Sequence, residues 1–369
     1  MAHAHRRAAL RELLRAADLD ATLVTDLVNV RYLTGFTGSN AAVVVHAGDS
    51  ENDETRTRLV TDGRYTTQSA EQVPELPRVI ERACAVAGVK AAVGDGVRRL
   101  GFESAQVTVD AHTGLLEVAS ESGGACDLVR APDLVQSLRV VKDEEELAAL
   151  RRACAAADAA LADLVAAGGI RAGRTEREVS DDLERRMREH GADGPSFETI
   201  VAAGANSAIP HHRPTDAVLR TGDFVKMDFG ALCDGYHSDM TRTMVLGEPA
   251  DWQRELYDLV AASQAAGRAA LGVDVELARV DASSRDVIKA AGRGAEFCHG
   301  LGHGVGLQIH EAPALAATAV GRLAAGMTVT VEPGVYLAGR GGVRIEDTLV
   351  VRSNGAELLT LTDRELLVL

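Results

Sequence analysis

Residues 224–245 read FVKMDFGALCDGYHSDMTRTMV and alternate in the manner of a β-hairpin. One face of the first half is apolar and is formed by Val225, Met227 and Phe229. Asp228 therefore lies on the other face, because successive strand residues point to opposite sides. A two-residue turn at Asp234-Gly235 pairs Asp228 with Thr241. It leaves Asp239 diagonal to Asp228 on the same face, within reach of a shared ion.

Residues 327–348, MTVTVEPGVYLAGRGGVRIEDT, repeat this arrangement around a glycine-rich turn. The apolar positions that point inward are Met327, Val329, Val331, Val343 and Ile345. Glu332, Arg344 and Glu346 then lie on the outward face. Four carboxylates on two such faces would repel one another strongly where they converge, unless a cation neutralised them. The alternative interpretation is that each acid faces water.

Residues 299–311, HGLGHGVGLQIHE, add three histidines on a backbone of alternating glycines. The glycines argue against a helix and let the backbone approach a site closely. The spacing of His299 and His303 resembles a zincin pair, but the glutamate of H-E-x-x-H is missing. Three histidines beside four carboxylates favour a binding site over a purely structural role.

The composition narrows the class of protein. The chain has 369 residues, a formal net charge of −15 and 3% aromatic residues. The negative charge disfavours nucleic acids and anionic membranes as partners, and the few rings disfavour base stacking. Five cysteines without a C-x-x-C pair fit a reducing compartment. No apolar run approaches about 18 residues, and the N-terminus has no secretory signal, so we expect a soluble cytoplasmic enzyme.

The pattern of elements predicts two domains, residues 1–137 and residues 138–369. The first alternates helices with buried strands and has no phosphate-binding or nucleophile motif, which predicts an α/β scaffold. The second opens with a long amphipathic helix, indicated by a D-x-x-E cap at Asp143 and Glu146 and an apolar stripe behind it. Its separate helices and period-two segments predict an α+β domain with an antiparallel sheet.

The spaced motifs D-F-G…S-D-x-T-R-T, G-H-G-V-G-L-x-I-H-E, V-E-P-G-V-Y and G-G-V-R-I-E-D resemble those of the pita-bread metallopeptidases. Within that family the chain is similar to aminopeptidase P and prolidase. NVRYLTGFTGSN and LVTDGRY extend the resemblance into the first domain. The resemblance implies a creatinase-like N-terminal domain, a pita-bread catalytic domain and a homodimer. It also implies cleavage of Xaa-Pro bonds in di- or oligopeptides.

Matched motif by motif, the resemblance implies five metal ligands, which are Asp228, Asp239, His303, Glu332 and Glu346. Asp239 and Glu346 would bridge two divalent ions, whose four positive charges balance four carboxylates. One histidine among oxygen ligands suits Mn²⁺, which we favour, with Co²⁺ or Zn²⁺ as alternatives. A hydroxide shared by the two ions would attack the scissile carbonyl.

The resemblance also assigns roles around the ions. Glu332 would transfer the proton of the attacking water. His211 and His310 would bind the substrate and its transition state, while His299 and Ile309 would line the substrate pocket. Arg344 would orient the acids. His212 and His237 match no such position, and we expect them at the surface or in packing.

Other functions stay open. A methionine aminopeptidase would use the same ligands, but that branch generally lacks such an N-terminal domain. A non-catalytic pita-bread binding protein would share the fold, although such relatives usually lose ligands. Some prolidases place an arginine shortly after the H-E pair to bind the substrate carboxylate. Here the first arginine after that pair is Arg322, which favours aminopeptidase P over prolidase.

Overall fold

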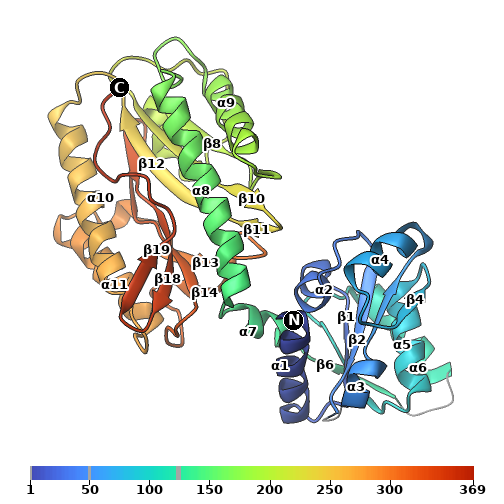
Figure 1. Ribbon diagram of the computed structural model, residues 1–369. Coiled ribbons are helices and arrows are strands. Elements are labelled where there is room, and N and C mark those ends of the chain that lie inside the picture. Colours follow the sequence, from blue (N-terminus) through green and yellow to red (C-terminus); the bar gives the residue numbers. More distant parts are fainter. Residues whose placement is uncertain (1, 49–50, 122–125) are drawn as a thin grey trace. The chain divides into compact units, whose positions relative to one another are not determined.

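The computed structural model describes residues 2–48, 51–121 and 126–369. The chain forms two compact units, Met1–Arg139 and Val140–Leu369 (Figure 1). We propose that residues 1–137 and 138–369 are the two domains of the chain.

The N-terminal unit is an α/β domain on one six-stranded sheet, with strand order β4-β3-β2-β1-β5-β6. The strands are β1 (Ala21–Val24), β2 (Ala41–His46), β3 (Arg58–Thr61), β4 (Arg78–Ile80), β5 (Arg99–Phe102) and β6 (Asp127–Arg130). β2 runs antiparallel to β1 and β3, whereas β1, β5 and β6 run parallel. The sheet is therefore mixed.

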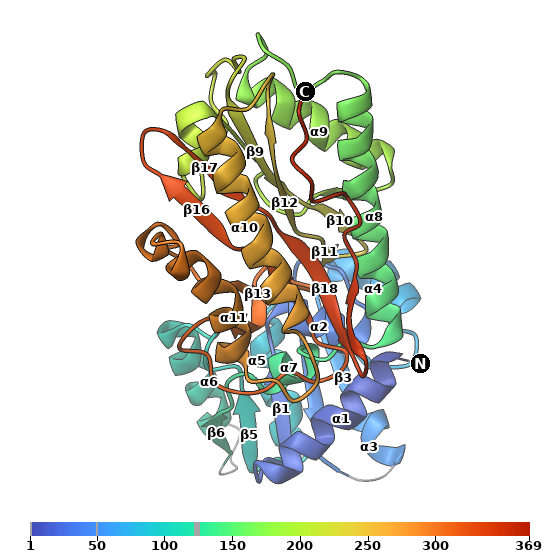
Figure 2. The same cartoon turned by 90° about the vertical axis from the view of Figure 1, so that its left-hand side faces the viewer.

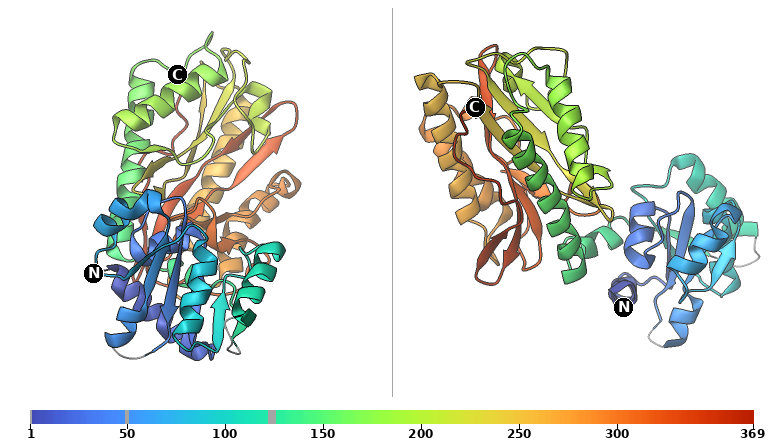
Figure 3. Two further views of the ribbon diagram at one scale, coloured as in Figure 1. Left: turned by 90° about the vertical axis from the view of Figure 1, so that its right-hand side faces the viewer. Right: turned by 45° about the horizontal axis from the view of Figure 1, so that its top comes forward.

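Helices cover both faces of this sheet (Figures 1 and 3). They are α1 (Ala2–Ala16), α2 (Leu27–Thr34), α3 (Glu51–Arg56), α4 (Thr66–Gln72), α5 (Cys84–Gly94), α6 (Val109–Glu121) and α7 (Leu134–Arg139), with a 3₁₀ turn at Gly63–Tyr65. Val89 of α5 and Leu115 of α6 pack in one apolar core with Leu23 of β1. All predicted site residues lie outside this unit, which agrees with a scaffold.

The C-terminal unit contains four long helices, which are α8 (Glu144–Ala166), α9 (Glu176–Glu189), α10 (Asp251–Ala269) and α11 (Leu277–Ala290). The predicted cap is confirmed, because Asp143 accepts from the amide of Glu146 and the Glu146 side chain accepts from the amide of Asp143. Such a reciprocal box satisfies amides that the first helical turn leaves unpaired. The sequence alone therefore fixes where α8 begins.

Two antiparallel ladders form the centre of this unit. The first has the order β12-β9-β8, with β8 (Ile200–Ala203), β9 (Phe224–Phe229) and β12 (Met240–Val245). The second has the order β14-β13-β15-β18-β19, with β13 (Gly302–Gly304), β14 (Glu311–Leu315), β15 (Thr328–Val331), β18 (Asp347–Arg352) and β19 (Gly355–Leu358). Short strands extend the two hairpins, namely β7 (Gly194–Pro195), β10 (Ala231–Cys233), β11 (Tyr236–His237), β16 (Gly334–Leu337) and β17 (Gly341–Arg344).

The helices pack on the apolar face of each ladder, and α8 and α10 flank β12 and β18 in Figure 2. Met227 of β9 shares a core with Leu161 of α8 and Leu183 of α9. Val331 of β15 shares a second core with Val260 of α10. One face of each ladder is thus occupied by apolar packing, and the opposite face carries the predicted acids.

Two predictions from composition can be compared with this fold. All five cysteines are free. Within the described ranges, no helix combines the length and the apolar composition needed to cross a bilayer.

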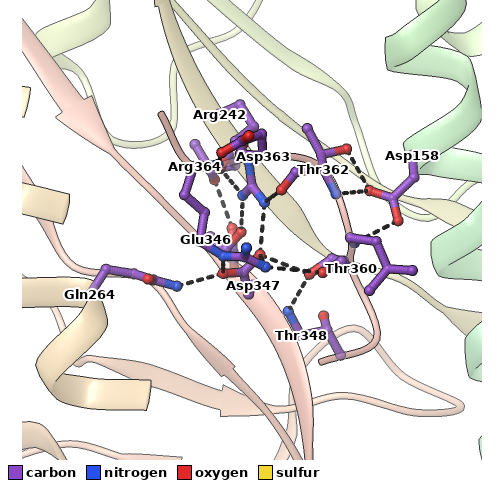
Figure 4. Close-up of polar contacts among 12 residues, drawn as sticks. Asp158, Arg242, Gln264, Glu346, Asp347, Thr348, Thr360, Thr362, Asp363 and Arg364 are labelled. Atoms are coloured by element: carbon purple, nitrogen blue, oxygen red, sulfur yellow. Dashed lines mark hydrogen bonds and ion pairs between the residues drawn. The ribbon is translucent and has the colours of Figure 1, made fainter. Parts of the chain in front are cut away.

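Asp347 of β18 ties the C-terminal segment to the helical side of the ladders (Figure 4). Its buried carboxylate accepts from Arg242 Nη2 at 2.8 Å, Gln264 Nε2 at 2.6 Å and Arg364 Nε at 2.5 Å. Burial raises the pKa of Asp347, but Arg242 and Arg364 lower it by more, so the group stays ionised. One carboxylate thereby joins β12, α10, β18 and the chain end.

We predict that Asp347→Asn destabilises the protein by about 3–5 kcal/mol, because two arginines would lose a buried ionised partner. The matched control is Asp216→Asn, which removes an exposed partner 3.2 Å from Arg177 and should barely change stability. Urea denaturation of the chelator-treated proteins measures both. Equal shifts of the two midpoints would contradict the prediction.

Candidate active site

A cavity of about 290 Å³ lies within the C-terminal unit, between the polar faces of the two ladders. Eight of the ten predicted site residues line it, namely His211, Asp228, Asp239, His303, Ile309, His310, Glu332 and Glu346. The remaining two, His299 and Arg344, lie outside the cavity lining and contact it through other side chains. Residues more than 130 positions apart in the chain thus meet at one place.

The first hairpin has the predicted register. Asp228 of β9 pairs with Thr241 of β12. The turn is Asp234-Gly235, with φ of 49° and 73°, between the paired residues Cys233 and Tyr236. Positive φ at both turn residues is the geometry that Asp-Gly favours. The local sequence therefore sets the face on which Asp228 lies.

Three side chains offer ligand atoms within 4.8 Å of one another, from Asp239, His303 and Glu346. His303 Nε2 lies 3.5 Å from Asp239 Oδ2 and 3.4 Å from Glu332 Oε1. His303 Nδ1 contacts the carbonyl oxygen of Gly304 at 3.0 Å, and because that oxygen only accepts, Nδ1 carries the hydrogen. Nε2 is then a lone pair directed at carboxylate oxygens, an arrangement that a bound cation would stabilise.

The acids are crowded and buried. Burial, followed by the neighbouring carboxylates, raises the pKa of Asp239 and of Glu346 well above their ordinary values. Burial also raises the pKa of Glu332 to about 8. Burial lowers the pKa of His303 to about 4, so this imidazole is neutral near pH 7. Carboxylates crowded in this way repel one another unless a positive charge lies between them. Carboxylate oxygens and a neutral imidazole are also suitable ligands, so the arrangement fits a site for divalent cations.

Arg344 of β17 supplies one fixed positive charge behind these acids. It is buried and donates from Nη2 to Asp228 Oδ2 and from Nε to Thr241 Oγ1. Thr241 in turn donates to Glu346 Oε2 at 2.7 Å. Asp228 Oδ1 is buried and has no hydrogen-bond partner among the described residues. Asp228 is therefore held by one oxygen while the other is available for a ligand.

A second chain of hydrogen bonds runs from Arg344 to His299. Arg344 Nη1 donates to the hydroxyl oxygen of Tyr336 at 2.9 Å. His299 Nδ1 donates to the carbonyl of Gly300, so its Nε2 accepts from the Tyr336 hydroxyl at 2.9 Å. Burial lowers the pKa of His299 to about 4. His299 is thus a neutral side chain fixed by Tyr336.

His211, Ile309 and His310 also line the cavity. The rings of His303 and His310 meet edge to face, with centroids 4.5 Å apart. Burial lowers the pKa of His211, and Arg344 contributes to the same shift. Phe197 and Ile200 add apolar surface to the lining. The cavity lining therefore combines carboxylates, imidazole groups and apolar side chains.

Several residues of the site were not assigned from the sequence. Tyr336 stands in the motif V-E-P-G-V-Y, but the motif gives no sign of its bond to His299. Glu176 resembles an ordinary acid of a first helical turn, yet it is buried and accepts from His212 Nε2 at 2.8 Å. His212 is buried, as a packing histidine would be, but it also lines the cavity, which the sequence did not predict. His237 contacts Ser196 with its Nδ1.

Comparisons with known proteins agree with this geometry. Residues 148–353 match metallopeptidase family M24, and residues 6–141 match the creatinase/prolidase N-terminal domain. The uncharacterized peptidase YqhT of Bacillus subtilis is 38% identical over 98% of this chain and 99% of its own. The structure of a Xaa-Pro dipeptidase from Bacillus anthracis is 37% identical, with a TM-score of 0.92 and coverage of 100% of both chains.

An X-Pro aminopeptidase from Thermotoga maritima is 33% identical, with a TM-score of 0.86 over 98% of each chain. Similarity to both of these peptidases extends over both units of this chain. The chain belongs to metallopeptidase family M24 and combines the pita-bread catalytic domain of that family with a creatinase/prolidase N-terminal domain.

Proposed function

We propose that this protein hydrolyses the Xaa-Pro bond at the N-terminus of peptides with two divalent metal ions. The observation that carries the proposal is the convergence of Asp239, His303 and Glu346 on one cavity, beside Asp228 and Glu332. Two structurally similar proteins, a Xaa-Pro dipeptidase and an X-Pro aminopeptidase, support the same bond specificity.

The five ligands are proposed as one set, the ligand cluster, formed by Asp228, Asp239, His303, Glu332 and Glu346. By the resemblance to the family, Asp239 and Glu346 would hold both ions, Asp228 would help to hold one of them, and His303 with Glu332 would help to hold the other. Mn²⁺ is the favoured ion, with Co²⁺ or Zn²⁺ as alternatives.

The bound ions would polarise the scissile carbonyl and lower the pKa of the attacking water. Glu332 accepts the proton of that water and delivers it to the proline nitrogen, which must be protonated to leave. His310 and His211 donate hydrogen bonds to the oxygen on which negative charge develops. His299 and Ile309 shape the space for the substrate, and Arg344 keeps Asp228 and Tyr336 in place.

Arg213 bears on the choice between dipeptides and longer peptides. The sequence has no arginine shortly after the H-E pair. Arg213, however, lines the cavity, and its Nε lies 3.1 Å from Glu198 Oε2. We propose that Arg213 receives the carboxylate of a dipeptide substrate. Comparison of kcat/KM for Ala-Pro and for Ala-Pro-Ala measures the preference between dipeptides and longer peptides.

Two other functions are less well supported. A methionine aminopeptidase would not need the N-terminal domain that residues 6–141 form. A non-catalytic binding protein would not need every ligand position filled, as it is here. A homodimer and a cytoplasmic location stay predictions from the sequence.

We predict that removal of divalent ions abolishes Xaa-Pro cleavage and that added Mn²⁺ restores it. Arg344 supplies one positive charge beside the four carboxylates of the ligand cluster, and bound ions would compensate the rest. Dialysis against a chelator, metal analysis and a cleavage assay test this. Full activity of a preparation shown to be metal-free would rule out the mechanism.

Glu346→Gln and His310→Ala should separate metal binding from catalysis. Glu346→Gln removes a proposed bridging charge and should lower the bound metal per chain. His310→Ala should keep that metal but lower kcat by roughly 10²–10³-fold, because it removes one donor to the developing charge. Metal analysis beside kinetics distinguishes them. Equal loss of metal would make His310 a ligand.

The proline requirement should appear as a preference for Ala-Pro-Ala over Ala-Ala-Ala of at least about tenfold in kcat/KM. Proline has no amide hydrogen and a fixed φ. An alanine in its place buries an N–H without an assured acceptor, which costs about 1–3 kcal/mol. Equal kcat/KM values would refute the Xaa-Pro assignment and leave a metal-dependent peptidase of other specificity.

A further inference from the structure

Lys226 is a buried amine side chain that the proposed chemistry does not use. It lies on β9, two residues before Asp228, and none of its surface is exposed. Its Nζ donates to the carbonyl of Ile209 at 2.6 Å and to that of Pro210 at 3.2 Å. Among the described residues no carboxylate forms an ion pair with it. Lysine is almost never fully buried unless it is paired. The burial of Lys226 on two backbone carbonyls, without a carboxylate, therefore requires an explanation.

Those carbonyls belong to residues 209–212, an irregular stretch that carries His211 into the cavity. Irregular backbone has no ladder partners, so its carbonyls must find donors elsewhere. Arg344 Nη1 also donates to the Pro210 carbonyl, at 3.1 Å. Two buried donors thus hold the peptide unit that immediately precedes His211.

The other side of His211 is held in a different way. Glu176 accepts from the ring of His212 at 2.8 Å and from the amide of Thr215 at 3.0 Å. His211 itself is exposed to the cavity between these two anchored flanks. Its position depends on the anchors, because no regular element holds this stretch.

Lys226 and Asp228 share one face of β9, since they are two residues apart on a strand. The same strand therefore carries a proposed metal ligand and the support of a proposed substrate-binding histidine. Nζ also lies 5.1 Å from the ring centroid of Tyr336. Lys226 thereby touches both the His211 stretch and the residue that fixes His299.

We propose that Lys226 is a positioning residue that sets the place of His211 relative to the ligand cluster. The inference rests on the proposed function only for its kinetic consequence, since the anchoring itself is a structural property. Burial, with Arg344 nearby, lowers the pKa of Lys226 to about 6. The amine donates N–H groups in either protonation state, so the anchoring does not depend on its charge.

The first test is kinetic and uses Lys226→Met, which keeps the length and apolar stem of the side chain but removes both donors. With Ala-Pro-Ala and Mn²⁺, kcat should fall by about tenfold or more, with little change in KM, because His211 acts on the developing charge. In a His211→Ala background the same substitution should change kcat by less than about twofold, since coupled residues are not additive. An equal loss in both backgrounds would overturn the proposal.

Lys226→Gln provides a second variant, because its amide keeps an N–H donor near the two carbonyls. Its kcat should fall between those of the wild type and Lys226→Met, and it replaces Lys226→Met in the cycle if the latter does not fold. The matched control is Tyr257→Phe, which removes a buried hydroxyl donor from the carbonyl of Arg364, bonded at 3.0 Å. That control should leave kcat unchanged.

The second test needs no activity. Exchange of the backbone amide hydrogens of Ile209, His211, His212 and Arg213 should be faster in Lys226→Met than in the wild type, while Tyr257→Phe should leave it unchanged. Unaltered exchange in Lys226→Met would overturn the proposal. A wild-type protein without Xaa-Pro activity would instead refute the proposed function, and the exchange experiment would still decide the role of Lys226.

Discussion

The crowding of largely buried carboxylates in one cavity is the constraint on which the proposed chemistry depends. Asp239, Glu332 and Glu346 have raised pKa values, and burial is the first cause in each case. One fixed cation, Arg344, contacts Asp228 directly and reaches Glu346 through Thr241. A single guanidinium cannot balance four acids. Divalent ions would balance the negative charge that Arg344 leaves uncompensated. The same ions would also supply the proposed chemistry.

The acids can gather in one place because each ladder has two different faces. One face is apolar and packs against long helices, and the other is free to carry acids. The helical side contains its own buried acid, Asp347, and this one is compensated by Arg242 and Arg364 (Figure 4). Neighbours in sequence, Glu346 and Asp347 thus have opposite electrostatic environments. The pKa of Asp347 is lowered, whereas that of Glu346 is raised.

The histidines of the site act through fixed tautomers. His303 and His299 each donate from Nδ1 to the carbonyl of the following glycine, which leaves Nε2 as an acceptor. In His303 that lone pair faces the acids, and in His299 it faces the hydroxyl of Tyr336. Both imidazoles therefore have the same tautomer, and the place of each in the tertiary structure decides what its Nε2 faces. His211 has no such local device, and its flanks are anchored by Lys226 and Glu176.

The sequence by itself determined the register of the first hairpin, the face on which Asp228 lies and the start of α8, because period-two alternation, an Asp-Gly turn and a capping box are local rules. It also identified eight residues that line the cavity, through spaced motifs. Tertiary structure alone decided the partners of Tyr336, Lys226 and Glu176. Their bonds join residues far apart in the chain, and no local pattern distinguishes a buried Glu176 from an exposed acid at the start of a helix. It likewise brought Arg213 to the cavity, because the fold and not the spacing from the H-E pair sets which arginine lies there.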